Sequence, residues 1–496
     1  MPAVDATFAL LDWIVLFAYG VSMLFIGWFY GRKNQTEEDY LLGGRKMNPT
    51  AIGISLFASL LSTISYLTYP GEMIKHGPLI FGGLLAFPLV YYIAGWWLIP
   101  RIMQMNVTSA YEILETKLGL RVRLFATFMF LSLRLLWMAT IIYVTVDVAL
   151  LSTLQFDRSY VPLIGAILTL ITIVYTSMGG LKAVVFTDVV QTSIFMAGAL
   201  ISVAVVCYEM GSFTALFPTT WPEYWDPLRW DFDPLERTTV GNAVLVLLVW
   251  YICTTGSDQM AIQRYLATKD IHAARKSFKI SIYSTILTYL LLALVGLAMI
   301  TYFTNHPSFL PDTTDLTDHA DILFPRFILV ALPSGLSGLI IAGLLAAAMS
   351  SMSSGLNSVS AVVSEDLIKR FKSTKNLTTK DKLNQVRRLS YLTGALVLLL
   401  SLFVGSVQGN LLDVIMKVVN LFVAPLFVLF FMALFVPFAT ERATLMAGGI
   451  SVFMAIGVAF YSFLGITVLW IMPSSLIVGI AVGILFSLGE QILGKK

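Results

Sequence analysis

The sequence predicts an all-α polytopic membrane protein. Of its 496 residues, 57% are hydrophobic and only 12% are charged, which is about half the charged fraction of a water-soluble domain. About thirteen apolar runs are long enough to span a bilayer as helices, and their centres lie near residues 20, 60, 92, 138, 168, 196, 248, 289, 342, 397, 423, 450 and 480. We therefore expect a single transmembrane domain. The net charge of +3 gives no reason to expect a nucleic-acid partner.

The first run, near residue 20, is interpreted as a retained helix, because it lacks the basic segment and the cleavage site of a secretory signal. Alternate loops along the chain carry most of the 32 Lys and Arg residues, including Arg264, the run at 369–388 and the tail Lys495 and Lys496. The positive-inside rule then predicts an outside N-terminus and a cytoplasmic C-terminus. We expect the protein to lie in the plasma membrane, which in a bacterium is the inner membrane.

Motifs of enzymes are missing from the sequence. The two cysteines, Cys207 and Cys253, have no metal-ligand spacing. The four histidines form no HExxH pair, and neither a GxSxG element nor a Walker A loop occurs. Neither an enzyme nor an ATP-driven pump is therefore expected.

Hydroxyl groups interrupt the run near residue 60. Five of them lie between Pro49 and Pro70, namely Ser55, Ser59, Ser62, Thr63 and Ser65. A helix that breaks here would free backbone carbonyls for an ion and a substrate, so the sequence predicts a broken helix. The alternative is that the hydroxyls bond back to their own helix.

Arg134 is the clearest charge inside a predicted span. It lies eleven residues past Arg123, which places it roughly 16 Å deep at 1.5 Å per residue. A guanidinium at that depth needs an anion, and a substrate carboxylate is predicted. The alternatives are a structural pair with Asp147, about 20 Å away along the same helix, or a carboxylate from another helix.

Asp188 is the second buried charge, in a run that begins just after Gly179 and Gly180. The two glycines permit a tight turn at the membrane surface. A lone buried carboxylate takes up either a proton or a cation. Asp188 is therefore a candidate cation ligand.

A strip of oxygen atoms is predicted on the helix that contains LLAAAMSSMSSGLNS, residues 344–358. Helical spacing places Ser350, Ser353, Ser354 and Asn357 on one face, with Ser351 beside them. Such a face suits a hard monovalent cation. The alternative is a plain contact between helices, which small and hydroxylated residues also favour.

Four segments resemble, in the same order, segments of the sodium/solute symporter family, which includes sodium/glucose cotransporters and sialic acid carriers. They are TSAYEILETKLG at 108–119, YTSMGGLKAVVFTDVVQ at 175–191, DQMAIQRYLATKD at 258–270 and AAAMSSMSSGLNS at 346–358. The resemblance implies a leucine-transporter-like fold with breaks in the runs near 60 and 248. Its two inverted five-helix repeats would span 49–210 and 239–438, with one extra helix within 1–48 and two within 439–496.

The resemblance also implies the sites. A first sodium ion would bind the backbone of Ala58 and Leu61, together with Ala347, Ser350 and Ser351. A second sodium ion, present in the sialic acid symporters of the family, would bind Asp188, Ser353 and Ser354 and share Ser350. Arg134 would hold a substrate carboxylate, with Ser59, Ser62 and Ser65 around it. Gly82-Gly83 stands where the sialic acid carriers have a glutamine, which implies a smaller or different substrate.

The expected function is sodium-coupled import of a small carboxylate, such as sialic acid, a related sugar acid or a monocarboxylate, by alternating access with two sodium ions. The protein is expected to work as a monomer in lipid. The nearest alternative is a sodium/sugar or other neutral-solute symporter, in which Arg134 pairs with a protein carboxylate. A membrane sensor or a channel on the same scaffold is the alternative from a different class.

Overall fold

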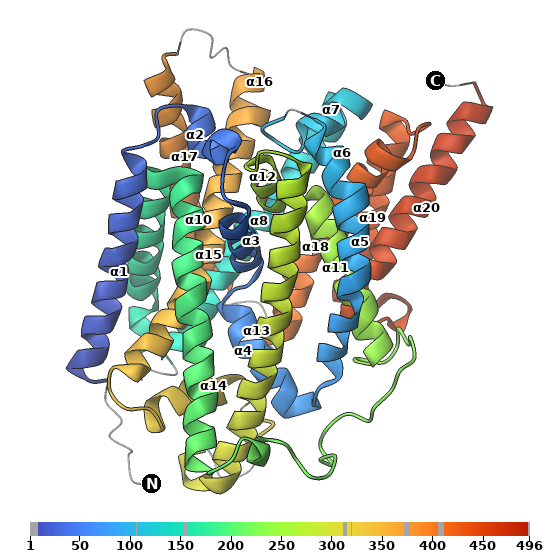
Figure 1. The fold of residues 1–496 in the computed structure, drawn as a ribbon. Coiled ribbons are helices and arrows are strands. Elements are labelled where there is room, and N and C mark those ends of the chain that lie inside the picture. Colours follow the sequence, from blue (N-terminus) through green and yellow to red (C-terminus); the bar gives the residue numbers. More distant parts are fainter. Residues whose placement is uncertain are drawn as a thin grey trace.

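Helices are the predominant secondary structure of the computed structural model, which describes residues 8–105, 107–151, 157–310, 315–318, 320–371, 377–404 and 411–494. They pack as one bundle, and none of these residues forms a strand (Figure 1). α1 (Leu10–Gly31) begins at one end of the bundle, and α20 (Ile471–Ile492) ends at the other (Figure 1). The all-α prediction is confirmed, whereas Lys495 and Lys496 lie outside the described residues.

The remaining helices of the first half are α2 (Glu37–Leu42), α3 (Pro49–Leu60), α4 (Thr63–His76), α5 (Phe87–Ile93), α6 (Ile99–Met103), α7 (Glu112–Leu118), α8 (Leu120–Tyr143) and α10 (Val161–Glu209). Those of the second half are α11 (Val240–Ser257), α12 (Gln259–Leu266), α13 (Ile271–Asn305), α14 (Ala320–Val330), α15 (Leu336–Val362), α16 (Lys369–Phe371), α17 (Thr379–Val404), α18 (Leu411–Phe435) and α19 (Glu441–Tyr461). Three π-helical segments extend them: η3 (Ala94–Leu98), η4 (Val144–Leu150) and η8 (Val363–Ile368). Short 3-10 segments are η1 (Gly43–Arg45), η2 (Leu79–Ala86), η5 (Arg158–Tyr160), η6 (Thr214–Leu216), η7 (Pro307–Phe309), η9 (Phe463–Gly465) and η10 (Val468–Trp470).

Ten helices in the described part of the chain are long and apolar enough to cross a membrane, and the bent pair α3 and α4 makes an eleventh span. The 49-residue α10 is counted as one span here, although a kink at Gly180 divides it. In α18, the segment Val419–Phe435 is apolar but shorter than a full span. The predicted count of about thirteen spans therefore stays a prediction.

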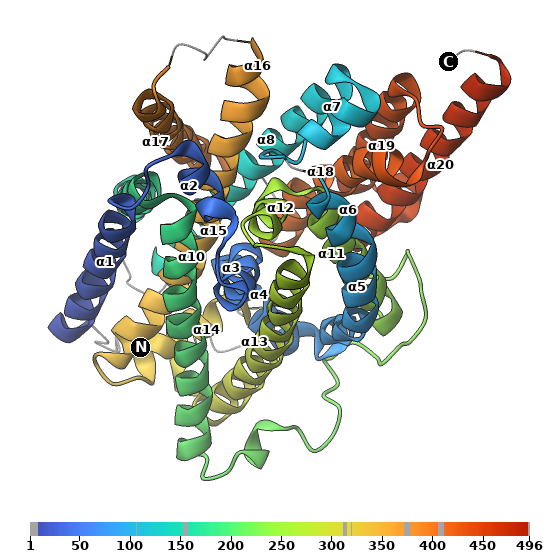
Figure 2. The same cartoon turned by 45° about the horizontal axis from the view of Figure 1, so that its top comes forward.

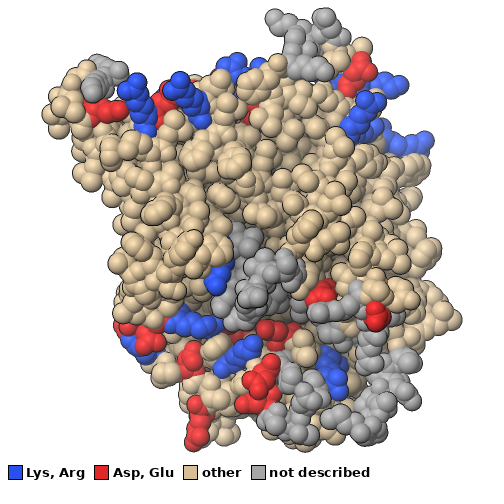
Figure 3. All heavy atoms as spheres, turned by 180° about the vertical axis from the view of Figure 1, so that it is seen from behind, with Lys and Arg blue, Asp and Glu red and all other residues tan. Residues whose placement is uncertain are grey.

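Charge is distributed as a membrane protein requires. On the face shown in Figure 3, Lys, Arg, Asp and Glu gather at the two ends of the bundle, and the band between them is almost uncharged. Large apolar side chains are exposed along the bundle, for example Phe25 of α1 and Phe128 of α8. An uncharged belt of this kind suits the hydrocarbon core of a bilayer.

The break between α3 and α4 lies within the interval that the sequence predicted. Asn48 caps α3 by accepting a hydrogen bond from the Thr50 backbone N–H at 2.8 Å, and Pro49 occupies the first turn. The chain then becomes extended at Leu61 and Ser62, and α4 leaves at 67° to α3. Figures 1 and 2 place this break near the middle of the bundle. The predicted broken helix is confirmed.

A second break separates α11 from α12 at Asp258. This residue is extended, with φ −82° and ψ 122°, and its Oδ1 caps α12 by accepting from the Met260 backbone N–H at 2.8 Å. α12 is only 8 residues long and is buried along its whole length. The prediction that the run near residue 248 is broken is thus confirmed.

The helix that carries the serine strip, α15, is capped by α1. Gly335, at its start, has φ +91° and offers no capping side chain. The carboxylate of Asp12 on α1 fills that role, because its Oδ1 accepts from the backbone N–H groups of Gly335 and Gly338, each at 2.7 Å. The extra N-terminal helix therefore fixes the position of α15 in the bundle.

Candidate cation and substrate sites

The predicted first sodium site is assembled where the end of α3 meets the middle of α15. Ser350 Oγ lies 3.0 Å from the carbonyl oxygen of Ala58 and 3.1 Å from that of Ala347. Ser351 Oγ lies 2.6 Å from the carbonyl oxygen of Leu61. All five predicted residues thus come together, and their oxygens are neutral carbonyls and hydroxyls of the kind that bind sodium at a broken helix.

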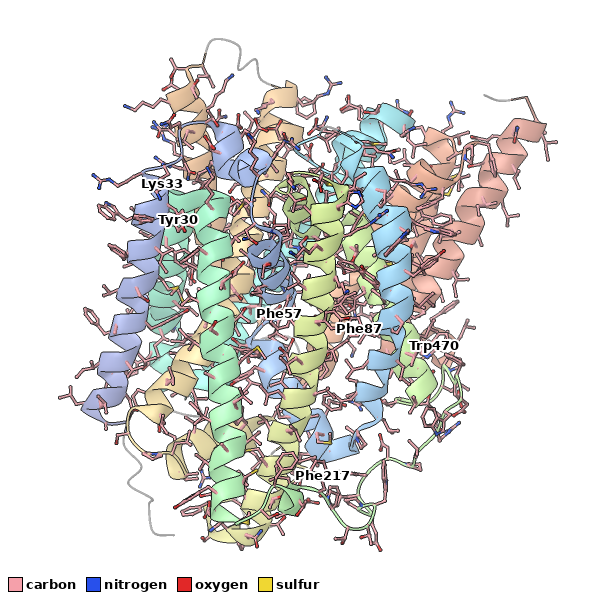
Figure 4. The ribbon with its side chains drawn as sticks, in the orientation of Figure 1. Tyr30, Lys33, Phe57, Phe87, Phe217 and Trp470 are labelled. Atoms are coloured by element: carbon pink, nitrogen blue, oxygen red, sulfur yellow. The ribbon has the colours of Figure 1, made fainter. Side chains whose placement is uncertain are left out.

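The break between α3 and α4 makes this arrangement possible. Leu61 is extended, so its carbonyl has no role inside a helix and is free to accept from Ser351. The preceding turn is held in place by Phe57, which is buried and lies at the middle of the bundle (Figure 4). From α10, Tyr175 donates a hydrogen bond to the carbonyl of Met349 at 3.1 Å.

The residues predicted for the second sodium ion lie along the next turn of α15. Ser353 Oγ donates to the carbonyl of Ser350 at 3.0 Å. Ser354 Oγ lies 2.8 Å from Ser59 Oγ. Asp188, from the second half of α10, is fully buried, and one arginine guanidinium contacts both Asp188 and Ser354. The structure therefore brings Asp188 and the serines into one cluster.

That guanidinium belongs to Arg264, whose predicted place was wrong. The positive-inside pattern predicts Arg264 in a cytoplasmic loop, but the structure buries it completely on α12. Its Nη2 lies 3.3 Å from Asp188 Oδ2 and 2.5 Å from Ser354 Oγ, and its Nε lies 3.0 Å from Ser55 Oγ. Asp188 is consequently not the lone carboxylate that the sequence suggested.

The sequence held only a weak signal for this residue. A count of basic residues near span ends treats any arginine there as a loop residue. The one hint is that Gln259, Gln263 and Arg264 occur in a short segment with few flanking charges, and all three are fully buried in the structure.

A cavity of about 170 Å³ lies beside the predicted sodium ligands, between α4, α8, α11 and α18. Aromatic side chains form much of its wall, namely Tyr69, Trp137, Trp250, Tyr251 and Tyr289. Phe87 of α5, labelled in Figure 4, supports Tyr251 in an edge contact with ring centroids 4.9 Å apart. The cavity extends to Glu72 of α4 and Thr238, just before α11.

Three of the four predicted substrate residues, Ser59, Ser65 and Arg134, line this cavity. Ser62 does not; it is fully buried at the break, and its hydroxyl has no hydrogen-bond partner in the described structure. Ser59 contacts both regions, because it lines the cavity and also meets Ser354 of the second cation cluster.

Arg134 has a protein partner that the sequence could not name. Its Nη2 forms a salt bridge with Oδ2 of Asp258, the residue at the break between α11 and α12. Arg134 is 6% exposed and Asp258 is 2% exposed, and the Nε of Arg134 is left without a hydrogen-bond partner among the described residues. The sequence alternative of a carboxylate from another helix is thus the observed arrangement in this conformation.

The predicted departure at Gly82-Gly83 has a packing explanation. A Cβ atom at Gly82 would lie 2.8 Å from Val240, and one at Gly83 would lie 3.0 Å from the carbonyl oxygen of Ala243. The glycines let η2 lie directly against α11, and neither lines the cavity.

Comparison with known proteins matches residues 40–451 to the sodium:solute symporter family. The sodium/sialic acid symporter of Proteus mirabilis is 29% identical over 442 residues, which cover 86% of this chain and 85% of that protein. Human sodium-coupled monocarboxylate transporter 1 is 29% identical over 477 residues, which cover 93% of this chain and 75% of that protein.

Solved structures agree with the fold. A substrate-bound, outward-open Na+-coupled sialic acid symporter superposes with a TM-score of 0.86 at 25% identity, over 97% of this chain and 98% of that one. The nucleobase-cation symporter Mhp1 superposes with a TM-score of 0.53 at 11% identity, over 90% of this chain and 94% of that one. The leucine-transporter-like fold is confirmed, and the family match covers most of the chain. The chain therefore belongs to the sodium:solute symporter family.

Proposed function

We propose that this protein imports a small organic acid, such as sialic acid, a related sugar acid or a monocarboxylate, together with two sodium ions. The observation that carries the proposal is Arg134, which lines the aromatic cavity and whose buried Nε–H has no hydrogen-bond partner among the described residues. A guanidinium offers a carboxylate a fork of donors, and exchange of Asp258 for a substrate carboxylate would conserve charge in the site. The names of the sialic acid and monocarboxylate relatives support an acidic solute.

The test is a panel of small carboxylates and sugars added to the purified protein. The true substrate is expected to raise the melting temperature only in the presence of sodium, because a ligand stabilises the state that it binds. Uptake competition between a sugar acid and its uncharged analogue then decides whether charge is recognised.

The salt bridge between Arg134 and Asp258 favours a second candidate, a neutral-solute symporter. In that case the pair stays closed throughout the cycle, and the hydroxyls of Ser59, Ser65 and Thr254 on the cavity wall bind the solute. Stabilisation by an uncharged sugar and not by its acid would decide for this candidate.

Coupling to two ions suits an acidic solute. Each positive charge that moves inward gains about 2.3 kcal/mol per 100 mV, so two ions gain about 4.6 kcal/mol at that potential. An anion cancels one of these charges, and the second ion keeps the cycle electrogenic. We propose that the protein lies in the plasma membrane, with its N-terminus outside and its C-terminus in the cytoplasm. We also propose that the monomer is the working unit and that the protein transports its solute without catalysing a reaction.

Ser351→Ala is expected to weaken the apparent sodium affinity far more than it disturbs folding. The change deletes a hydroxyl that faces the Leu61 carbonyl, and an unmet polar contact of this kind costs about 1–3 kcal/mol. Sodium titration of substrate uptake measures the effect, and the melting temperature in sodium-free buffer is the folding control. An unchanged sodium dependence, or equal uptake driven by protons without sodium, would refute the first site.

The wild-type protein is expected to show a Hill coefficient for sodium above one, and Asp188→Asn or Ser354→Ala should bring it toward one. Ser350→Ala should weaken the apparent sodium affinity more than either of these changes, because Ser350 would bind both ions. Parallel measurement of charge and substrate flux in proteoliposomes gives the stoichiometry. If the wild-type protein carries only one sodium ion per substrate molecule, the proposed second sodium site is wrong.

A further inference from the structure

The proposed second sodium site contains a cation of the protein itself. The guanidinium of Arg264 lies between Asp188, Ser354 and Ser55, and a further nitrogen, Nη1, lies 2.9 Å from the carbonyl oxygen of Met260. Arg264 and Asp188 are both 0% exposed. The site therefore holds a closed ion pair in this conformation.

Sodium and the guanidinium need the same oxygens. Asp188 Oδ2 accepts hydrogen bonds from Ser55 and Arg264, and the Ser354 hydroxyl oxygen accepts from Arg264. A sodium ion added beside this pair would leave a net positive charge in a buried site, which costs much more than in water. One carboxylate cannot neutralise both cations.

We propose that Arg264 is the resident counter-ion of Asp188, and that sodium enters the second site by displacing it. This inference rests on the proposed second sodium site. Oδ1 of Asp188, which has no hydrogen-bond partner among the described residues, is where an ion first makes contact. The displaced guanidinium keeps its bond to Met260, because that carbonyl belongs to the same helix.

The displacement reaches the substrate cavity through α12. This short helix carries Arg264 in its last turn and is capped by Asp258, which pairs with Arg134. Sodium that releases Arg264 from Asp188 removes one of the two ion pairs that fix α12, and a substrate carboxylate that releases Asp258 from Arg134 removes the other. Binding of sodium thus lowers the free-energy cost of separating Arg134 from Asp258, and binding of the substrate lowers the cost of separating Arg264 from Asp188. The two sites are therefore positively coupled.

The test compares Arg264→Gln with Arg264→Lys in the purified full-length protein without substrate. Glutamine removes the competing charge, so the sodium concentration that gives half of the rise in melting temperature is expected to fall about tenfold. Lysine keeps a cation in place and should leave that concentration near the wild-type value. If Arg264→Gln needs as much sodium as the wild type, or more, the proposal that sodium displaces Arg264 is wrong.

Ser55→Ala provides a second variant if Arg264→Gln does not fold. It removes the hydroxyl that holds both Arg264 Nε and Asp188 Oδ2 and should lower the half-maximal sodium concentration in the same direction, by about two- to fivefold. An unchanged or higher sodium requirement in Ser55→Ala also counts against the exchange.

Wild-type stoichiometry separates the two ideas. Two sodium ions per substrate, with no gain in affinity in Arg264→Gln, would overturn the exchange and leave the second site of the proposed function intact. One sodium per substrate would overturn both.

Discussion

Arg134→Lys is expected to abolish substrate uptake while substrate-free sodium binding survives. An ammonium cannot reproduce the fork that a guanidinium presents to a carboxylate. Arg134→Ala should behave alike, because loss of the charge-assisted pair costs roughly 2–5 kcal/mol of binding. Radiolabelled uptake measures the loss, and the sodium-dependent melting temperature shows whether the cation sites are intact.

Asp258→Asn is the matched control for this prediction. Asparagine caps a helix as well as aspartate does, so α12 should still form, while Arg134 loses its protein partner. If the substrate is an acid, the variant should keep substrate binding with higher affinity, since the carboxylate no longer competes with Asp258. Without substrate the variant leaves the buried Arg134 charge unpaired and should lose about 3–5 kcal/mol of stability in either case, so the substrate affinity decides: a pair that is only structural would give no gain in affinity. Normal transport by Arg134→Ala would contradict the acidic-substrate proposal directly.

Gly180→Ala is expected to cause a marked loss of stability together with a loss of sodium binding. Gly180 divides α10 with φ +60° and ψ −160°, a conformation that is essentially confined to glycine and costs other residues about 1–3 kcal/mol. Its added Cβ would also lie 2.6 Å from the carbonyl oxygen of Tyr40. Because the half of α10 after Gly180 carries Asp188, relief of the clash should shift that carboxylate.

The melting temperature with and without sodium measures both effects. Gly211→Ala is the control, because Gly211 also has positive φ, +70°, but no atom lies near its added Cβ. A comparable loss in both variants would mean that backbone strain alone is responsible. A Gly180→Ala variant with wild-type sodium dependence would contradict the link between the kink and Asp188.

Sequence patterns alone predicted the membrane class, the break between α3 and α4 and the oxygen strip of α15. These features follow from local patterns, because apolar run length reports a span and the 3.6-residue period places Ser350 and Ser354 on one face. The family resemblance added the backbone partners Ala58 and Leu61, and the structure brings them within hydrogen-bond distance of the strip.

The pairing of the buried charges depends on how distant helices pack together. Arg264 meets Asp188 across 76 residues of sequence, Arg134 meets Asp258 from another span, and Asp12 caps α15 across 323 residues. No periodicity within one helix can report such pairs, since each depends on how two distant elements dock. The free energy of a buried charge requires that a partner exist, but the packing of α1, α10 and α12 around α15 determines which residue it is.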